Sequence, residues 1–164
     1  MKLTIDVAVE GEDWRVAAPG LEHLAERVAE ACLAAANPPL SEGAELSVLF
    51  CDDAKIRTLN AAWRSQDKAT NVLSFPAASL SQLPSARILG DVAVAFQTAQ
   101  REARDEGKPF KDHVAHLLAH GLLHLLGFDH ENDEDAERME AIERDALGRL
   151  GVPDPYRAQD LEAR

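Results

Sequence analysis

The eleven residues HGLLHLLGFDH (His120–His130) combine a histidine pair typical of a metal-binding helix with the signal that ends that helix. His120 and His124 are four residues apart, so on an α-helix their rings lie on one face, one turn apart. Gly127 readily adopts the left-handed conformation that ends a helix. His130 follows this turn, and the chain can therefore bring it toward the other two rings from a third direction.

Imidazole nitrogen is a good ligand for zinc and for neighbouring transition metals. The spacing predicts that His120, His124 and His130 bind one Zn²⁺ per chain, with other divalent transition metals as alternatives. His116 continues the row on the same helix face, but it lies ~12 Å along the axis from His124. Since Zn–N bonds are about 2.0–2.1 Å long, one ion cannot bind both ends of that row. We expect His116 to pack against the site or to orient a ligand.

The spacing His-x3-His-x2-Gly-x2-His is that of the metzincin metalloprotease helix. Gly121 stands where those enzymes carry the glutamate base, so the peptidase chemistry is absent. Three protein ligands leave a coordination position open, as in catalytic zinc sites. Asp129 is expected either to orient a ligand through that ligand's second ring nitrogen or to be a cap or a surface acid. His23 and His113 are expected to be partly exposed surface residues.

Alternating apolar residues predict strands, and apolar residues three or four apart predict helices. The predicted strands cover residues 2–10, 45–51, 71–75 and 88–96. The predicted helices cover residues 21–36, 97–106, 109–126 and 133–150. A further helix is predicted after Asp52 or Asp53, which can cap it, and it carries Ile56, Leu59, Asn60 and Trp63 at helical spacing.

This order, β-α-β-α-β-β-α-α-α, predicts an α+β fold in which helices cover a small mixed sheet. The site helix is expected to resemble that of metzincin-type metallohydrolases. We expect residues 1–150 to form a single domain and residues 151–164 to form a peripheral C-terminal tail.

The charge of the chain is unevenly distributed. Its 17 Lys and Arg against 29 Asp and Glu give a net charge of −12, which argues against nucleic-acid binding over the whole surface. Residues 55–111 nevertheless carry a net charge of +4, between segments of −8 each. This pattern allows a local anion-binding patch, or equally a solvated basic helix face.

Compartment and redox state can also be read from the sequence. The N-terminus does not resemble a secretory signal, and no apolar run approaches the roughly 20 residues that span a bilayer. We therefore expect a cytoplasmic protein without membrane contact. Cys32 and Cys51 lie in apolar stretches and form no CxxC pair, so we expect buried free thiols.

The eleven-residue motif resembles the signature of the YbeY ribosome-maturation endoribonucleases. Two further blocks resemble the same family in the same order: LNAAWRSQDKATNVLSFP (Leu59–Pro76) and LGDVAVA (Leu89–Ala95). Three positions depart from the family pattern. Phe128 and Trp63 stand where tyrosine is usual, and Asn71 stands where aspartate is usual. If that aspartate acts as a base, this chain lacks it, whereas asparagine serves equally well as a cap at the start of a strand.

The resemblance implies that the three histidines bind a zinc-type ion and that Arg64 is the catalytic basic residue facing it. A guanidinium can bind a phosphate through two parallel hydrogen bonds and can stabilise charge that develops during cleavage. Lys68 can extend this substrate-binding surface for single-stranded RNA.

The implied activity is that of a metal-dependent, single-strand-specific endoribonuclease. By resemblance it acts in ribosomal RNA processing, notably 3′-end maturation of the small-subunit RNA, and in ribosome quality control. Expected partners are ribosomal RNA and the ribosome or its proteins, and a monomer is expected for one small domain.

Two alternatives stay open from the sequence. One is a metallohydrolase of another class, including a peptidase; Gly121 argues against it, and a peptide-cleavage screen would detect it. The other is a non-catalytic ribosome-assembly factor with a structural metal, in which case folding depends on the metal and a chelator unfolds the protein.

Overall fold

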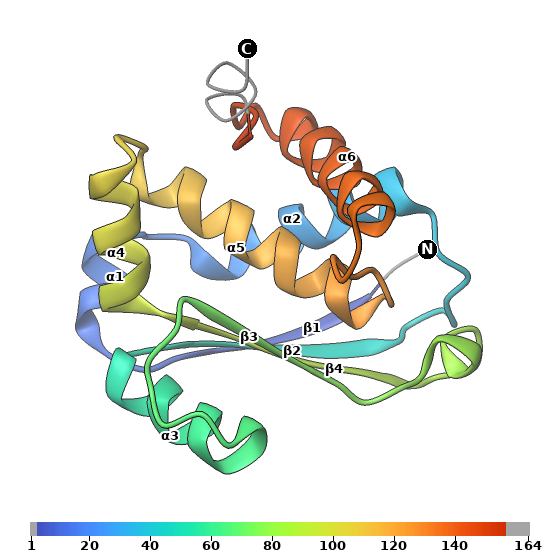
Figure 1. Ribbon diagram of the computed structural model, residues 1–164, viewed down its shortest axis with the longest axis horizontal. Coiled ribbons are helices and arrows are strands. Elements are labelled where there is room, and N and C mark those ends of the chain that lie inside the picture. Colours follow the sequence, from blue (N-terminus) through green and yellow to red (C-terminus); the bar gives the residue numbers. More distant parts are fainter. Residues whose placement is uncertain (1–2, 157–164) are drawn as a thin grey trace.

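A four-stranded mixed sheet with the strand order β1-β2-β4-β3 lies at the centre of the computed structural model, which describes residues 3–156 (Figure 1). The strands are β1 (Thr4–Val9), β2 (Glu45–Cys51), β3 (Val72–Pro76) and β4 (Ile88–Ala95). β1, β2 and β4 run parallel, and β3 pairs antiparallel with β4 as an edge strand. The predicted α+β class and mixed sheet are confirmed.

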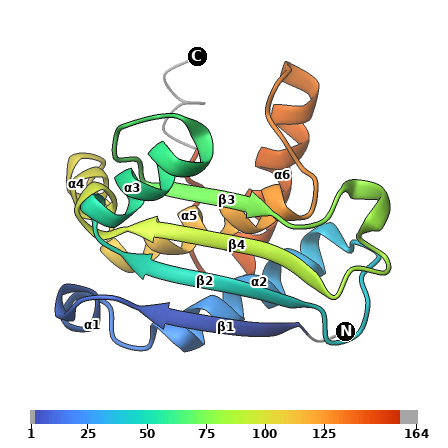
Figure 2. The same ribbon diagram turned by 90° about the horizontal axis from the view of Figure 1, so that it is seen from below.

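Helices cover the two faces of the sheet unequally. The α-helices within the described residues are α1 (Glu12–Ala17), α2 (Leu21–Ala36), α3 (Asp53–Arg64), α4 (Phe96–Asp105), α5 (Phe110–Leu125) and α6 (Asp133–Arg149). Figures 1 and 2 show α2, α5 and α6 on one face of the sheet and α3 on the other. α5 packs directly on β3 and β4, and α6 packs on α2 and α5. The helix predicted to carry the histidines is thus held between the sheet and two other helices.

The main apolar core lies between the sheet and the α2–α5–α6 layer, and a smaller cluster lies under α3. Trp14 is fully buried in the main core, and its Nε1 donates to the carbonyl oxygen of Cys51 at 2.7 Å. Its ring meets those of Phe50, Phe96 and Phe110. Cys32 and Cys51 are buried free thiols, as predicted.

The predicted elements differ from the observed ones mainly at their ends. α2 and β2 have the predicted bounds, and the others are shifted by one or a few residues. α1 and the short 3₁₀ helix Leu80–Gln82 were not predicted, because six and three residues are too few to show a helical period. Of the predicted first strand, Lys2 lies outside the described residues. Within residues 3–156, no helix is both long enough and apolar enough to cross a membrane.

Gly121 sets how closely α5 approaches the sheet. A Cβ atom at this position would lie 2.7 Å from Cγ1 of Val92 and 3.2 Å from Oγ of Ser74. Ser74 Oγ donates to the carbonyl oxygen of Gly121 at 2.9 Å, which fixes the contact. Position 121 therefore faces the sheet, and any side chain there, including a glutamate base of the peptidase type, would force α5 and the sheet apart.

Candidate metal centre

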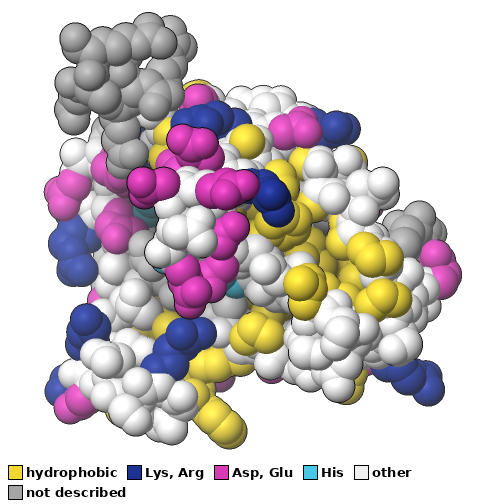
Figure 3. All heavy atoms as spheres, turned by 45° about the vertical axis from the view of Figure 1, so that its right-hand side comes forward, with side chains coloured by type: hydrophobic (Ala, Val, Ile, Leu, Met, Phe, Trp, Pro, Cys, Tyr) yellow, Lys and Arg dark blue, Asp and Glu magenta, His cyan; other side chains and the backbone are white. Residues whose placement is uncertain are grey.

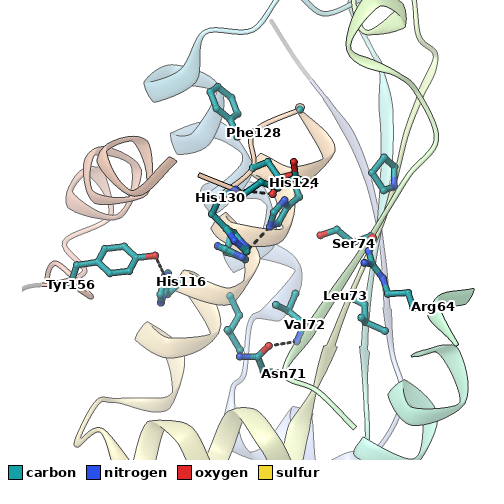
Figure 4. Close-up of a pocket in the computed structure, with 16 residues that line it drawn as sticks. Arg64, Asn71, Val72, Leu73, Ser74, His116, His124, Phe128, His130 and Tyr156 are labelled. Atoms are coloured by element: carbon teal, nitrogen blue, oxygen red, sulfur yellow. Dashed lines mark hydrogen bonds between the residues drawn. The ribbon is translucent and has the colours of Figure 1, made fainter. Parts of the chain in front are cut away.

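The end of α5 turns the chain back toward the helix. Gly127 has a φ of 93°, as predicted for a left-handed terminator. The backbone N–H of Phe128 donates to the carbonyl oxygen of Leu123 at 3.0 Å, which closes the turn. This return brings His130 close to His124, although six residues separate them in the sequence (Figure 4).

His120, His124 and His130 converge on one point. A ring nitrogen from each residue lies within 4.8 Å of the others. The Nε2 atoms of His120 and His124 are 3.1 Å apart. The ring centroid of His130 lies 5.5 Å from that of His120 and 5.2 Å from that of His124. The structure therefore brings the three predicted ligands together.

The chemistry of this cluster fits a transition-metal ion. His120 and His124 are partly buried and His130 is exposed, so one side of the cluster stays accessible. Burial lowers the pKa of His124, and the nearby rings of His120 and His130 lower it further. A neutral imidazole offers a nitrogen lone pair, and sets of imidazoles suit zinc, copper, iron and nickel. These three residues could hold such an ion.

Behind the cluster lies a fully buried carboxylate, Glu143 of α6, with 0% of its surface exposed. Oε1 accepts from Nδ1 of His120 at 2.7 Å. Oε2 accepts from Nε2 of His116 at 3.0 Å and from the hydroxyl of Tyr156. Burial by itself would raise the pKa of Glu143, but hydrogen bonds from His116, His120 and Tyr156 outweigh it and lower this pKa to about 2. Glu143 is therefore ionised at neutral pH.

Glu143 and Tyr156 were not predicted from the sequence as residues of the site. Glu143 shares its face of α6 with buried Met139 and Leu147. A carboxylate on an otherwise apolar helix face was therefore the one feature of the sequence that could have indicated Glu143. Tyr156 falls in the tail predicted to be peripheral. That prediction is wrong for this residue, because its ring lies 5.5 Å from that of His116. Tyr156 could not be identified from hydrophobic periodicity, because it is a single residue beyond the last helix.

His116 holds Glu143 and lies outside the cluster of three, in line with the expected orienting role. His23 is exposed, as predicted. The prediction for His113 is wrong, because only 4% of its surface is exposed. α4 packs on this part of α5, and Nε2 of His113 lies 2.9 Å from Oε1 of Glu102.

Asp129 caps the turn that carries His130. Its Oδ1 accepts from the backbone N–H of His130 at 2.7 Å. Of the roles expected for Asp129, the structure therefore shows the cap. The carboxylate that contacts a ligand histidine through its second nitrogen is Glu143.

A cavity of about 790 Å³ opens between the histidines and the edge strand β3. Arg64, the last residue of α3, lines this cavity at the strand wall (Figure 4). Its Nη2 donates to the carbonyl oxygen of Ser74 at 2.5 Å, and its Cζ lies 5.7 Å from the ring centroid of Phe75. Arg64 and the three histidines thus share one cavity from opposite walls.

Lys68 lies apart from this arrangement. It is exposed in the loop between α3 and β3, and the described residues that line the cavity do not include it. Its carbonyl oxygen accepts from Nδ2 of Asn60 at 3.0 Å, which ties the loop to α3.

Asn71 anchors the start of β3. Its Oδ1 accepts from the N–H of Val72 at 2.7 Å. Its Nδ2 donates to the carboxylate of Glu102, with N···O distances of 3.0 and 3.2 Å. An aspartate here would place two carboxylates against each other, so asparagine matches its neighbour in this chain. The structure therefore shows Asn71 as the strand cap that the sequence allowed.

The rim of the cavity is electrostatically divided. Asp129 and Glu131 line it beside His130, and Arg64 lines the opposite wall. Figure 3 shows acidic side chains gathered over the hollow in which histidine is visible, with basic side chains below it. An anionic ligand is therefore attracted to the wall that carries Arg64 and repelled by the wall that carries Asp129 and Glu131.

Comparisons with known proteins agree on one family. A family profile described as "Endoribonuclease YbeY" matches residues 6–151. The Methylocella silvestris protein named Endoribonuclease YbeY is 51% identical over 156 residues, which cover 95% of this chain and 87% of the relative. A protein of the same name from Azorhizobium caulinodans is 51% identical over 154 residues, covering 94% of this chain and 96% of that one.

The fold also matches a solved structure. The solution structure of TM1509 from Thermotoga maritima superposes with a TM-score of 0.58 at 24% identity, covering 90% of this chain and 91% of that one. At this identity the likeness concerns the fold alone.

Proposed function

The chain belongs to the YbeY endoribonuclease family, and from that premise we propose that it is a metal-dependent endoribonuclease that cleaves single-stranded RNA. Its proposed role is ribosomal RNA processing, in particular 3′-end maturation of the small-subunit RNA, and ribosome quality control. The observation that carries this proposal is the convergence of three imidazoles on a cavity that also holds an arginine.

We assign the metal ligands to His120, His124 and His130 and the ion to Zn²⁺, one per chain. The geometry that supports this assignment is the three ring nitrogens within 4.8 Å. When bound, such an ion supplies Lewis acidity to a phosphoryl oxygen. The three histidines line an open cavity, and this supports access of an RNA strand to the proposed centre.

Arg64 is the proposed catalytic and substrate-binding residue. Its resting partner is a neutral carbonyl oxygen, and within residues 3–156 it makes no ion pair. The positive charge is therefore available to a phosphate, which the planar guanidinium can bind through two hydrogen bonds. There it would stabilise the charge that develops as the phosphodiester bond breaks. Lys68, on the loop after α3, would extend this binding surface along the bound RNA strand.

The proposed setting is cytoplasmic, with the ribosome or its proteins as partners and a monomeric chain. The acidic segments that flank the basic middle of the sequence support contact with basic proteins more than extensive wrapping of RNA. We place the catalytic domain at residues 1–150 and the tail at 151–164, from which Tyr156 reaches the site.

The test compares cleavage of a single-stranded RNA and its duplex by metal-stripped protein, with and without added Zn²⁺. We expect cleavage of the single strand alone and only after Zn²⁺ is restored. His124→Ala and Arg64→Ala should each reduce the rate at least about 100-fold, because the first removes a proposed metal ligand and the second removes the cation proposed to stabilise the reacting phosphate. His23→Ala, at an exposed position on α2, is the matched control.

Circular dichroism of each variant ensures that lost activity is not lost folding. Full cleavage by folded His124→Ala or Arg64→Ala would refute the assignment. The chelated protein should stay folded, because the main apolar core forms without the three histidines. Unfolding on chelation would instead favour a structural metal.

A further inference from the structure

Glu143 is the only acidic side chain among residues 3–156 that is fully buried. It comes from α6, whereas the two histidines that it contacts come from α5. Burying a carboxylate is costly unless donors surround it, and an apolar residue would pack here without that cost. Its position therefore indicates a role beyond packing.

The two oxygens of Glu143 have different partners. Oε1 meets one donor, Nδ1 of His120, at 2.7 Å. Oε2 meets two donors, Nε2 of His116 at 3.0 Å and the hydroxyl of Tyr156. Carboxylate oxygens accept hydrogen bonds, and the three atoms that lie against Glu143, two ring nitrogens and a hydroxyl, are groups that can donate to them. The two donors on Oε2 hold the carboxylate in place, because rotating it would break their hydrogen bonds.

This arrangement decides which nitrogen His120 presents to the cavity. With the proton on Nδ1, a neutral ring carries its lone pair on Nε2. That Nε2 atom faces Nε2 of His124 at 3.1 Å, inside the cluster completed by His130. A carboxylate partner also makes an imidazole a more basic ligand.

We propose that Glu143 is a positioning residue that fixes His120 in the tautomer able to bind a metal ion through Nε2, and that Tyr156 and His116 hold Glu143 in this orientation. This inference rests on the proposed metal centre and deepens it. It gives residues 151–156 a function, because Tyr156 lies beyond the last helix and completes the hydrogen bonds of Glu143.

Glu143→Gln tests this role with almost no change in shape. A glutamine side chain has one accepting oxygen and one donating NH₂ group, so it can satisfy His120 or the two donors on the other side, but not both. The Zn²⁺ affinity should fall about 10- to 100-fold, as found for carboxylates that orient metal ligands. Tyr156→Phe removes one of the two donors on Oε2 and should cause a smaller loss. Glu137→Gln, at an exposed acid on the same helix, is the matched control and should bind Zn²⁺ like the wild type.

Two measurements on the full-length chain decide the matter. Competition with a chromophoric chelator gives the Zn²⁺ dissociation constant of each variant. ¹⁵N NMR of the metal-free wild type shows which ring nitrogen of His120 carries the proton. We expect the proton on Nδ1 and an affinity order of wild type, then Tyr156→Phe, then Glu143→Gln. A proton on Nε2, or an unchanged affinity in Glu143→Gln, would overturn the inference.

A merely structural role would lower the melting temperature of metal-free Glu143→Gln and leave its Zn²⁺ affinity unchanged. If Glu143→Gln does not fold, the tautomer of His120 in the wild type and the Zn²⁺ affinity of Tyr156→Phe still test the inference. Absence of Zn²⁺ binding by the wild type would refute the proposed function instead, and the NMR result would then separately report whether Glu143 sets the tautomer of His120.

Discussion

Replacing Gly121 with alanine should destabilise the protein, although alanine is the better helix former. Alanine in a helix interior is favoured over glycine by about 0.8–1.0 kcal/mol. At this position, however, the added Cβ would lie 2.7 Å from Cγ1 of Val92, 3.2 Å from Oγ of Ser74 and 3.3 Å from Cγ2 of Val72. Carbon atoms pack at about 3.5–4.0 Å, so α5 and the sheet would have to separate by roughly 1 Å.

The strand side of this contact cannot yield easily. Val92 is fully buried on β4, and its β-branched side chain is stiff. Overpacking of this kind costs about 1–3 kcal/mol, so the expected net loss is about 1 kcal/mol after the gain in helix propensity. Since His120 adjoins Gly121 on α5, the shift should also move this proposed ligand relative to His130 and weaken Zn²⁺ binding.

Gly148→Ala is the control, because nothing lies within 4 Å of a Cβ built at this position of α6. Gly148→Ala should raise the free energy of unfolding by up to about 1 kcal/mol, so the two variants should differ by about 2 kcal/mol in stability. In thermal unfolding of metal-free protein, this difference corresponds to about 4–8 °C. If Gly121→Ala is as stable as Gly148→Ala, α5 does not pack on the sheet as described.

Two further predictions concern the core and a helix end. Burial raises the pKa of the Cys32 and Cys51 thiols to about 12, so a thiol reagent at pH 8 should leave both unmodified until denaturant is added. Because these pKa values rise on folding, the contribution of the thiols to the free energy of unfolding is fully present below about pH 9 and is lost as the pH rises toward 12. A free energy of unfolding that stays constant over this pH range would contradict this. Asp52→Ala should cost about 1 kcal/mol in denaturant unfolding, because the Asp52 carboxylate accepts from the N–H of Lys55 at 2.8 Å and caps α3; an unchanged midpoint would show that the cap contributes nothing.

Local sequence signals predicted most of the fold. α2 has the predicted bounds because its apolar period is long and Asn37-Pro38-Pro39 marks its end. α1 was missed although it carries Trp14, since a six-residue helix shows no period and its stability comes from the core around that ring. The end of α5 was predictable because Gly127 is a local signal with a local cause.

The site was predictable only where its residues are close in sequence. The three histidines lie within one helix and its turn, so their spacing predicted the cluster. Glu143 and Tyr156 reach it through the packing of α6 on α5, which the spacing of residues cannot show. The burial of His113 depends in the same way on which helix covers that side of α5. Tertiary contacts, rather than the motif, therefore determine the surroundings of the proposed ligands.

Element-resolved metal analysis of the wild type beside His130→Ala tests the central claim most directly. His130 is exposed beyond the end of α5, so its removal should leave the fold intact while breaking the cluster. We predict about one zinc per wild-type chain and almost none in the folded variant, because two imidazoles from one helix face hold an ion poorly. Zinc retained by His130→Ala, or absent from the wild type even after Zn²⁺ is supplied, would contradict the account.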